Sequence, residues 1–294
     1  MNEDIAVKIQ RLKKEKNAVI LVHNYQLPEV QDIADFTGDS LGLSIKASQT
    51  QAGMIVFCGV RFMAETASII CPDKLVVIPD PEAGCFMSDM ITAGLLMKEK
   101  AKHPGAVVIS YVNTTADVKA GSDVCCTSAN AVEVVNSIPA EKEIIFVPDM
   151  YLGSYAAKMT GRRIHLYGGY CPTHLRITAK YILEMKQKHP KALVVAHPEC
   201  RPEVTEIADK VASTEGIIRF CRESDAKEFI IGTENGVIYK LFSENPGKIF
   251  YEACPMAVCV NMKLTTLEKV LWTLEGGYGE AVKVPEDVRV KAYE

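Results

Sequence analysis

Runs of four to seven apolar residues alternate along the chain with segments whose apolar positions recur at helical spacing. This alternation predicts strands followed by helices, and therefore an α/β fold with parallel sheets. Three of the apolar runs resemble one another; they begin at Ala18, Ala106 and Ala192, which lie 88 and 86 residues apart. A repeat of this length is one small α/β module rather than a solenoid unit. We therefore predict three similar small modules with parallel sheets, arranged around a pseudo-threefold axis.

The strands and helices expected after each of the three similar apolar runs set the module boundaries. We place the first module at residues 1–90, the second at 91–178 and the third at 179–262. A C-terminal helical extension follows at 263–294, and we expect it to pack back on the first module. Two further strands are expected in each module: at 54–59 and 74–79, at 124–128 and 143–148, and at 210–214 and 228–233.

Polar side chains follow the first strand of each module at a spacing of two residues. Such a spacing places both side chains on one face of an extended strand. In parallel sheets, ligands bind beyond the carboxyl ends of the strands. The sequence therefore predicts that these pairs line one shared polar site, although each pair alone could be solvated loop residues. The pairs are His23 and Tyr25, Tyr111 and Asn113, and His197 and Glu199.

Composition narrows the class of protein. The net charge of −4 lacks the basic excess expected of a nucleic-acid-binding protein. No apolar run is long enough to span a membrane, and the N-terminus has acidic residues where a signal peptide needs basic ones. We therefore expect a cytoplasmic protein that binds neither nucleic acid nor membrane, in which ten cysteines serve as metal ligands, catalysts or buried side chains rather than disulfides.

Three cysteines share the module period. Cys85, Cys171 and Cys254 lie 86 and 83 residues apart, and each comes shortly after an apolar strand. Three thiolates suit a zinc ion with an open position or an iron–sulfur cubane with one iron free of protein ligands. An open position is what a metal catalyst needs, although three buried cysteines spaced by coincidence remain the alternative. The other seven cysteines show no such period, and we expect buried or incidental thiols.

Several segments resemble the quinolinate synthase family, and together they run from about residue 5 to 290. Motifs of the family occur in all three modules. They are His23–Asp35 (HNYQLPEVQDIAD), Gly38–Leu41 (GDSL), Tyr111–Asn113 (YVN), Thr127–Ala131 (TSANA), His197–Cys200 (HPEC), Ser213–Thr214 (ST) and Met256–Lys263 (MAVCVNMK).

The resemblance implies a specific reaction and cofactor. Members of the family condense iminoaspartate with dihydroxyacetone phosphate, releasing quinolinate, phosphate and two waters in NAD biosynthesis. It implies three α/β modules and a [4Fe–4S] cluster held by one cysteine from each, here Cys85, Cys171 and Cys254. It also implies a functional link to an aspartate oxidase or dehydrogenase that supplies iminoaspartate.

Two positions depart from the family pattern. Tyr170 stands directly before Cys171 where the family usually has histidine, and only the later His174 is kept. Glu215 follows Ser213–Thr214 where a glycine-rich turn is usual, so a carboxylate could lie near an anionic substrate.

The expected chemistry assigns roles to the matched residues. Both substrates are anionic, and we expect hydroxyls and imidazoles to bind their carboxylate and phosphate oxygens. Ser40 could also cap the helix that begins near Leu41. Glu199 is the expected base, with a pKa raised by partial burial, and Tyr25 is the expected proton donor or orienting hydroxyl. The catalytic candidates are Tyr25, Tyr111, His197 and Glu199; the substrate-binding candidates are His23, Ser40, Tyr111, Asn113, Ser128, His197, Glu199 and Thr214.

Two other functions stay open at this point. The same strand-end groups would serve a cluster-dependent hydro-lyase that acts on a different hydroxy acid. A non-catalytic iron–sulfur sensor or scaffold is the alternative from another class, although no basic helix or apolar motif for a partner is visible. Arg219 and Arg222 could contact phosphate but are expected to be solvated.

Overall fold

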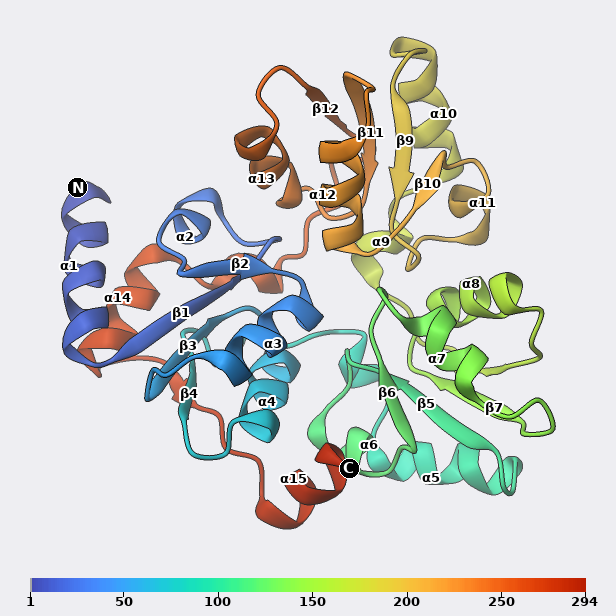
Figure 1. Cartoon of the computed structure of the whole chain (residues 1–294), viewed down its shortest axis with the longest axis horizontal. Coiled ribbons are helices and arrows are strands. Elements are labelled where there is room, and N and C mark those ends of the chain that lie inside the picture. Colours follow the sequence, from blue (N-terminus) through green and yellow to red (C-terminus); the bar gives the residue numbers. More distant parts are fainter. Residues whose placement is uncertain (1) are drawn as a thin grey trace. The chain divides into compact units, whose positions relative to one another are not determined.

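The computed structural model describes residues 2–294 and contains three sheets built from parallel strands (Figure 1). Each sheet has the same order of its first four strands: the second strand lies at the edge, followed by the first, third and fourth. The orders are β2-β1-β3-β4 with β13 added beside β4, β6-β5-β7-β8, and β10-β9-β11-β12. The predicted α/β fold with three similar modules is thus confirmed, while the pseudo-threefold axis stays a prediction.

The strands are short, as expected for modules of this size. In the first sheet they are β1 (Ala18–His23), β2 (Phe36–Gly38), β3 (Met54–Cys58), β4 (Leu75–Ile78) and the antiparallel β13 (Glu280–Ala281). The second sheet holds β5 (Val107–Tyr111), β6 (Val124–Cys126), β7 (Ile144–Val147) and β8 (His165–Leu166). The third holds β9 (Leu193–Ala196), β10 (Lys210–Val211), β11 (Glu228–Gly232) and β12 (Ile249–Glu252).

The helices connect these parallel strands. The longer ones are α1 (Asn2–Glu15), α3 (Ser40–Gln49), α4 (Arg61–Ile70), α5 (Ala93–Lys102), α8 (Met150–Thr160), α10 (Ala179–Lys188), α12 (Thr214–Glu223), α13 (Val237–Glu244), α14 (Leu267–Glu275) and α15 (Glu286–Tyr293). The shorter ones are α2 (Pro28–Asp32), α6 (Ala116–Ala120), α7 (Ala131–Ser137), α9 (Pro172–Leu175) and α11 (Pro202–Thr205). None of the helices within residues 2–294 combines the length and apolar composition needed to cross a membrane.

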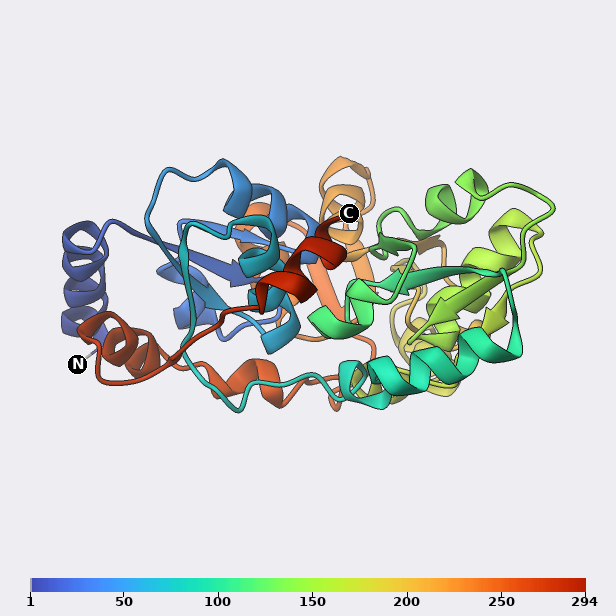
Figure 2. The same cartoon turned by 90° about the horizontal axis from the view of Figure 1, so that it is seen from below.

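The first sheet has helices on both faces. Helices α1 and α14 contact each other and strands β1 and β3, while α3 and α4 contact β1, β2 and β4 (Figure 1). Alternate residues of the strands follow this division: Ile20 and Val22 point into a core shared with α1 and α14. Helix α15, in red, lies against α4 and α6, where Val284 packs with Ile69 (Figure 2).

The structure corrects the expected strands of the first module. Its second strand is β2, and the runs expected at 54–59 and 74–79 are the third and fourth strands. Phe36–Gly38 has only three residues, so it has no apolar run that the sequence pattern could reveal. The corrected alignment adds Ser40 to the repeat, because Ser40, Ser128 and Thr214 each follow the second strand of their sheet by a few residues.

The chain forms two compact units. Unit 1 comprises the residues up to Asp89, Val112–Gly121 and Val260–Glu294, and it contains the first sheet. Unit 2 comprises Met90–Tyr111 and Ser122–Cys259, and it contains the second and third sheets. The module boundaries expected from the sequence stay a proposal; most of the second and third modules falls within unit 2, except residues 112–121 and 260–262, which belong to unit 1.

Candidate active site

The Glu199 carboxylate is buried in unit 2 and has a polar group close to each of its oxygens. Tyr111, the last residue of β5, donates its hydroxyl to Oε1 at 2.6 Å. The Nδ1 of His174 lies 2.9 Å from Oε2. Glu199 itself is only 4% exposed and follows β9, so the pair expected from the sequence does lie at a carboxyl strand end. Because the carboxylate is buried, the contacts with His174 and Tyr111 help to stabilise its charge.

Both ring nitrogens of His174 lie close to polar groups. It lies in the short helix α9, which Pro172 opens directly after Cys171. Its Nε2 lies 2.9 Å from the Thr233 hydroxyl, at the end of β11. The two ring nitrogens of His174 therefore face the Glu199 carboxylate and the Thr233 hydroxyl.

His197 is fixed as the tautomer that carries its proton on Nε2. Its Nδ1 accepts a hydrogen bond from the backbone N–H of Glu199 at 3.2 Å. Its Nε2 therefore donates to the Ser128 hydroxyl, 3.2 Å away. Burial lowers the pKa of His197 to about 3, against a smaller opposing effect of the Glu199 charge, so this imidazole is neutral at physiological pH.

The pKa of Glu199 is lowered, and the expectation that it is raised is wrong. Burial alone raises the pKa, but the imidazoles of His174 and His197 and the hydrogen bonds from His174 and Tyr111 outweigh burial. The sequence showed that Glu199 would be buried but did not show the donors that face it. Glu199 is therefore an ionised carboxylate across the neutral range.

Tyr111 keeps its proton. Burial and the adjacent Glu199 charge raise its pKa well above the usual value, and a hydrogen bond with Ser128 opposes this only in part. A continuous chain of hydrogen bonds thus runs from Thr233 through His174, Glu199 and Tyr111 to Ser128.

Asp149 adds a second buried carboxyl group near this chain. It follows β7 and caps helix α8, where its Oδ1 accepts from the backbone N–H groups of Tyr151 and Leu152 at 2.7 and 3.0 Å. The other oxygen, Oδ2, has no hydrogen-bond partner among the described residues, and the side chain is fully buried. Burial and then the charge of Glu199 raise the pKa of Asp149 well above its usual value. Their surroundings therefore shift the two carboxyl pKa values in opposite directions, that of Asp149 upward and that of Glu199 downward.

The three periodic cysteines occupy equivalent loops, each after the fourth strand of its sheet. Cys85 follows β4 in unit 1, whereas Cys171 and Cys254 follow β8 and β12 in unit 2. The Cys171 thiol lies within 4.8 Å of ligand atoms of His174 and Glu199, and Cys254 is 1% exposed. A thiol, an imidazole and a carboxylate at this spacing form a group that could hold a metal ion.

Five of the other seven cysteines are buried, as expected. Burial raises the pKa of these five thiols, that of Cys221 to about 12, which keeps them protonated. Cys125 is exposed, and Cys259 is half-buried. The five buried thiols are Cys58, Cys71, Cys126, Cys200 and Cys221.

Unit 1 carries the equivalent polar residues of the first sheet. His23 is buried at the end of β1, and its Nδ1 accepts from the backbone N–H of Tyr25 at 3.1 Å, as His197 does from Glu199. The Tyr25 ring meets the His23 ring edge-on at 4.5 Å. Lys263 donates to the Tyr25 carbonyl oxygen and so ties this turn to the end of the chain.

Helix N-termini hold two of the hydroxyl candidates. Ser40 is the first residue of α3, and Thr214 is the first residue of α12. The caps are the residues before them: Asp39 accepts from Gly42 N–H at 2.9 Å, and Ser213 accepts from Gly216 N–H at 3.2 Å. The expectation that Ser40 caps its helix is therefore wrong. Both hydroxyls instead lie beside the N–H groups of a first helical turn, where anions bind favourably.

The structure also shows the surroundings of Asn113 and of the two residues that depart from the family pattern, Tyr170 and Glu215. The Asn113 Oδ1 atom is buried and has no hydrogen-bond partner among residues 2–294. Tyr170 is half-buried, and its backbone N–H donates to the sulfur of Met90 at 3.4 Å. Glu215 lies in the first turn of α12, half-buried, next to Thr214.

The sequence pattern assigns no role to three residues of this site. They are Thr233, Asp149 and His174, of which only His174 stands out, as a histidine kept after Cys171. The signals were present: Pro172 predicts a helix that starts beside Cys171, and Asp149 and Thr233 end apolar strands. What brings them to Glu199 is the packing of the second and third sheets within unit 2, which no local pattern encodes.

This arrangement defines an α/β protein with three repeated sheets and a buried network of acid–base groups at the carboxyl ends of its strands. Sequence comparison gives the family. The profile of the family described as quinolinate synthetase A protein matches residues 7–294, and the chain belongs to this family.

Curated relatives agree over nearly the whole chain. The quinolinate synthase of Geobacter metallireducens is 54% identical over 290 residues, which cover 99% of this chain and 95% of that protein. The quinolinate synthases of Dehalococcoides mccartyi, strain BAV1, and Methanosarcina barkeri are each 53% identical, with the same coverage. The expected family is thus confirmed, and the chain is an enzyme of the quinolinate synthase type.

Proposed function

We propose that the chain condenses iminoaspartate with dihydroxyacetone phosphate to give quinolinate, phosphate and two waters, as a step of NAD biosynthesis. Family membership over residues 7–294 supports this reaction. The observation that carries the proposal is the hydrogen-bonded contact of Tyr111, Glu199 and His174, with the Cys171 thiol within 4.8 Å of the latter two. The atoms of the reaction balance without an oxidant or a reductant, so acid–base and dehydration chemistry suffices.

A [4Fe–4S] cluster bound by Cys85, Cys171 and Cys254 is part of the proposal. Three thiols on equivalent loops, one of them beside an imidazole and a carboxylate, fit a group with three protein sulfurs. Cys85, Cys171 and Cys254 would hold this cluster, which would supply a Lewis acid to polarise a substrate oxygen or nitrogen.

Glu199 accepts the protons that leave substrate carbon atoms. It is ionised at neutral pH, and the hydrogen-bond donors on its two oxygens hold it in one orientation. Its lowered pKa makes it a weak base in the resting state. His174 and Tyr111 keep this carboxylate in place, and Tyr111 stays neutral and donates a proton or a hydrogen bond.

Neutral groups bind the two anionic substrates. The buried His197 donates through Nε2, and Ser128 supplies a hydroxyl beside it. Asn113 offers an amide whose buried oxygen lacks a partner among the described residues. His23, Ser40, Thr214 and the hydroxyl of Tyr25 complete the proposed binding set from equivalent strand and helix ends.

Partners and compartment follow from the chemistry. Iminoaspartate would come from an enzyme that oxidises aspartate, either an oxidase or a dehydrogenase. Thiolate ligands need a reducing compartment, so we assign the enzyme to the cytoplasm.

Anaerobic protein, incubated with both substrates, tests the proposal. Quinolinate should appear by its ultraviolet absorbance together with one equivalent of phosphate. A cluster-dependent hydro-lyase would instead turn over a single hydroxy acid, and a sensor would turn over neither. Protein with an intact cluster that forms no quinolinate would refute the assigned reaction.

A further inference from the structure

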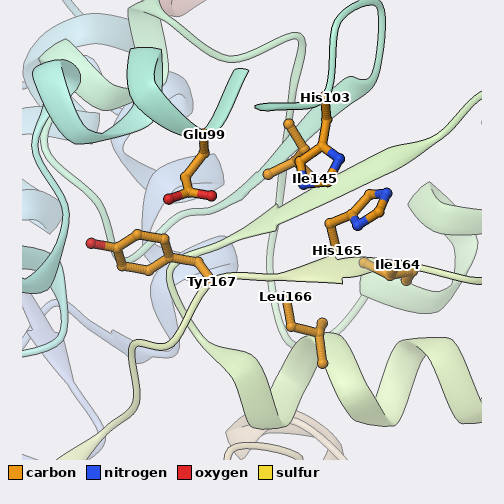
Figure 3. Close-up of a pocket in the computed structure, with 7 residues that line it drawn as sticks. All are labelled: Glu99, His103, Ile145, Ile164, His165, Leu166 and Tyr167. Carbon is orange, nitrogen blue, oxygen red and sulfur yellow. The ribbon is translucent and has the colours of Figure 1, made fainter. Parts of the chain in front are cut away.

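A second cluster of chemical groups lies at the opposite edge of the second sheet, away from Tyr111. His103 ends helix α5, Glu143 precedes β7, and His165 begins β8. All three therefore gather where strands of this sheet begin, whereas Tyr111 lies where β5 ends. A cavity of about 350 Å³ opens beside them, lined by both histidines (Figure 3). The proposed reaction uses none of these groups.

The Glu143 carboxylate bridges the two imidazoles. Its Oε2 lies 3.3 Å from His165 Nε2 and 3.8 Å from His103 Nδ1. One ligand atom from each of the three residues fits within a span of 4.8 Å. Ligands bound tetrahedrally to zinc at about 2.0 Å are roughly 3.3 Å apart, so these separations already approach the spacing that zinc requires.

The third sheet carries the same arrangement with one donor changed. There, His189 ends helix α10 and its ring stacks on that of Tyr251 in β12 at 3.6 Å, and Tyr251 donates to Glu228 at 3.1 Å. In the second sheet, the His103 ring stacks on His165, also at 3.6 Å. A ring stacked on the histidine that ends the helix is therefore a structural feature of both modules.

In the second sheet the ring stacked on the histidine is itself an imidazole, that of His165, whereas in the third sheet it is the phenol ring of Tyr251. A neutral tyrosine is a poor ligand for zinc, whereas two imidazoles and a carboxylate form a common zinc-binding set. Stacking on the helix-end histidine needs only an aromatic ring, as Tyr251 shows. His165 stacks in the same way and also offers a nitrogen that can bind a metal ion.

We propose that His103, Glu143 and His165 bind one zinc ion, with water in the fourth position. The stacked rings must open for this, and a rotation of the His165 side chain turns its Nε2 toward the ion. That side chain is 35% exposed and that of Glu143 is 64% exposed, so both have room to adjust. The ion links the end of α5 to the starts of β7 and β8, and its role is to stabilise this edge of unit 2.

Zinc binding to matched variants tests the site. The whole chain is prepared anaerobically with its cluster, so that the cluster thiols are occupied, and dialysed against zinc at low free concentration. His165→Tyr gives the second sheet the stack of the third, and His103→Gln removes the other imidazole. His189→Gln is the control, because it removes the corresponding histidine of the third sheet.

The wild-type chain and His189→Gln should bind one zinc equivalent more than His165→Tyr and His103→Gln. Zinc should also raise the thermal unfolding temperature of the first two proteins and leave that of the other two unchanged. Equal zinc content and affinity in all four proteins would overturn the proposal. So would a loss of zinc from His189→Gln, because it would place the ion elsewhere.

Discussion

Replacing Glu199 by glutamine removes the proposed base with little change in shape. The amide oxygen can still accept the hydrogen bond that Tyr111 makes at 2.6 Å. The amide nitrogen faces His174 Nδ1, which must then change from donor to acceptor. His174 can do so by moving its proton to Nε2 and donating to Thr233, 2.9 Å away. The contacts with Tyr111, His174 and Thr233 are therefore all kept in Glu199→Gln.

In Glu199→Gln the expected loss of catalytic rate is larger, in free energy, than the expected loss of folding stability. Two hydrogen bonds to a charged group become neutral ones, which costs about 1–3 kcal/mol of the free energy of unfolding. A positioned base contributes about 10²–10⁴-fold to the rate, equivalent to about 3–5 kcal/mol of activation free energy. Glu199→Ala would be far more damaging to folding, about 3–5 kcal/mol, since it leaves buried partners unpaired.

The assay compares quinolinate formation with denaturant unfolding for the same preparations. Glu199→Gln should keep the cluster absorbance and a cooperative unfolding transition but lose at least about a hundredfold in kcat. Glu203→Gln is the matched control, because Glu203 is exposed, lies four residues further on and forms an ion pair with Arg201 at 3.7 Å. A folded Glu199→Gln protein with the kcat of the control would refute the role of Glu199 as the base.

Two further predictions concern pH. His197 is neutral in the native state with a pKa of about 3 but titrates near 6.5 when unfolded, so its contribution is lost as pH falls below 6.5. Between pH 7 and 5 the wild-type chain should lose about 2 kcal/mol more of its free energy of unfolding than His197→Gln does; parallel curves would contradict a buried neutral imidazole. Asp149 has a raised pKa, so the wild-type chain loses stability as pH rises above 3.8, its ordinary value. In Asp149→Asn the amide oxygen can still cap α8, and the side chain does not titrate. The variant should therefore gain stability relative to wild type between pH 5 and 8. A constant difference in unfolding free energy would show that Asp149 is already ionised.

The sequence predicts the repeated parts of the molecule well. The first strand of each module is a clear apolar run, and parallel strands place polar residues at one edge, so His197 and Glu199 could be assigned to a site. The short β2 could not be predicted, since its three residues contain no apolar run. That omission shifted the expected alignment of the first module by one strand.

The electrostatics of the site could not be predicted. Burial of Glu199 was foreseen, and burial alone raises the pKa of a carboxyl group. The reversal depends on His174, which lies 25 residues earlier and reaches Glu199 from a four-residue helix. Likewise, only the folded chain brings His103 and His165 together, because 62 residues separate them in the sequence.

The cluster absorbance of Cys171→Ala tests the shared metal site most directly. Cys171 is the periodic thiol that lies within 4.8 Å of ligand atoms of His174 and Glu199, so its loss should abolish the brown chromophore and quinolinate formation together. Cys125→Ala, which removes an exposed thiol outside the periodic set, should retain both. A Cys171→Ala protein that keeps a full cluster and forms quinolinate would contradict the site described here.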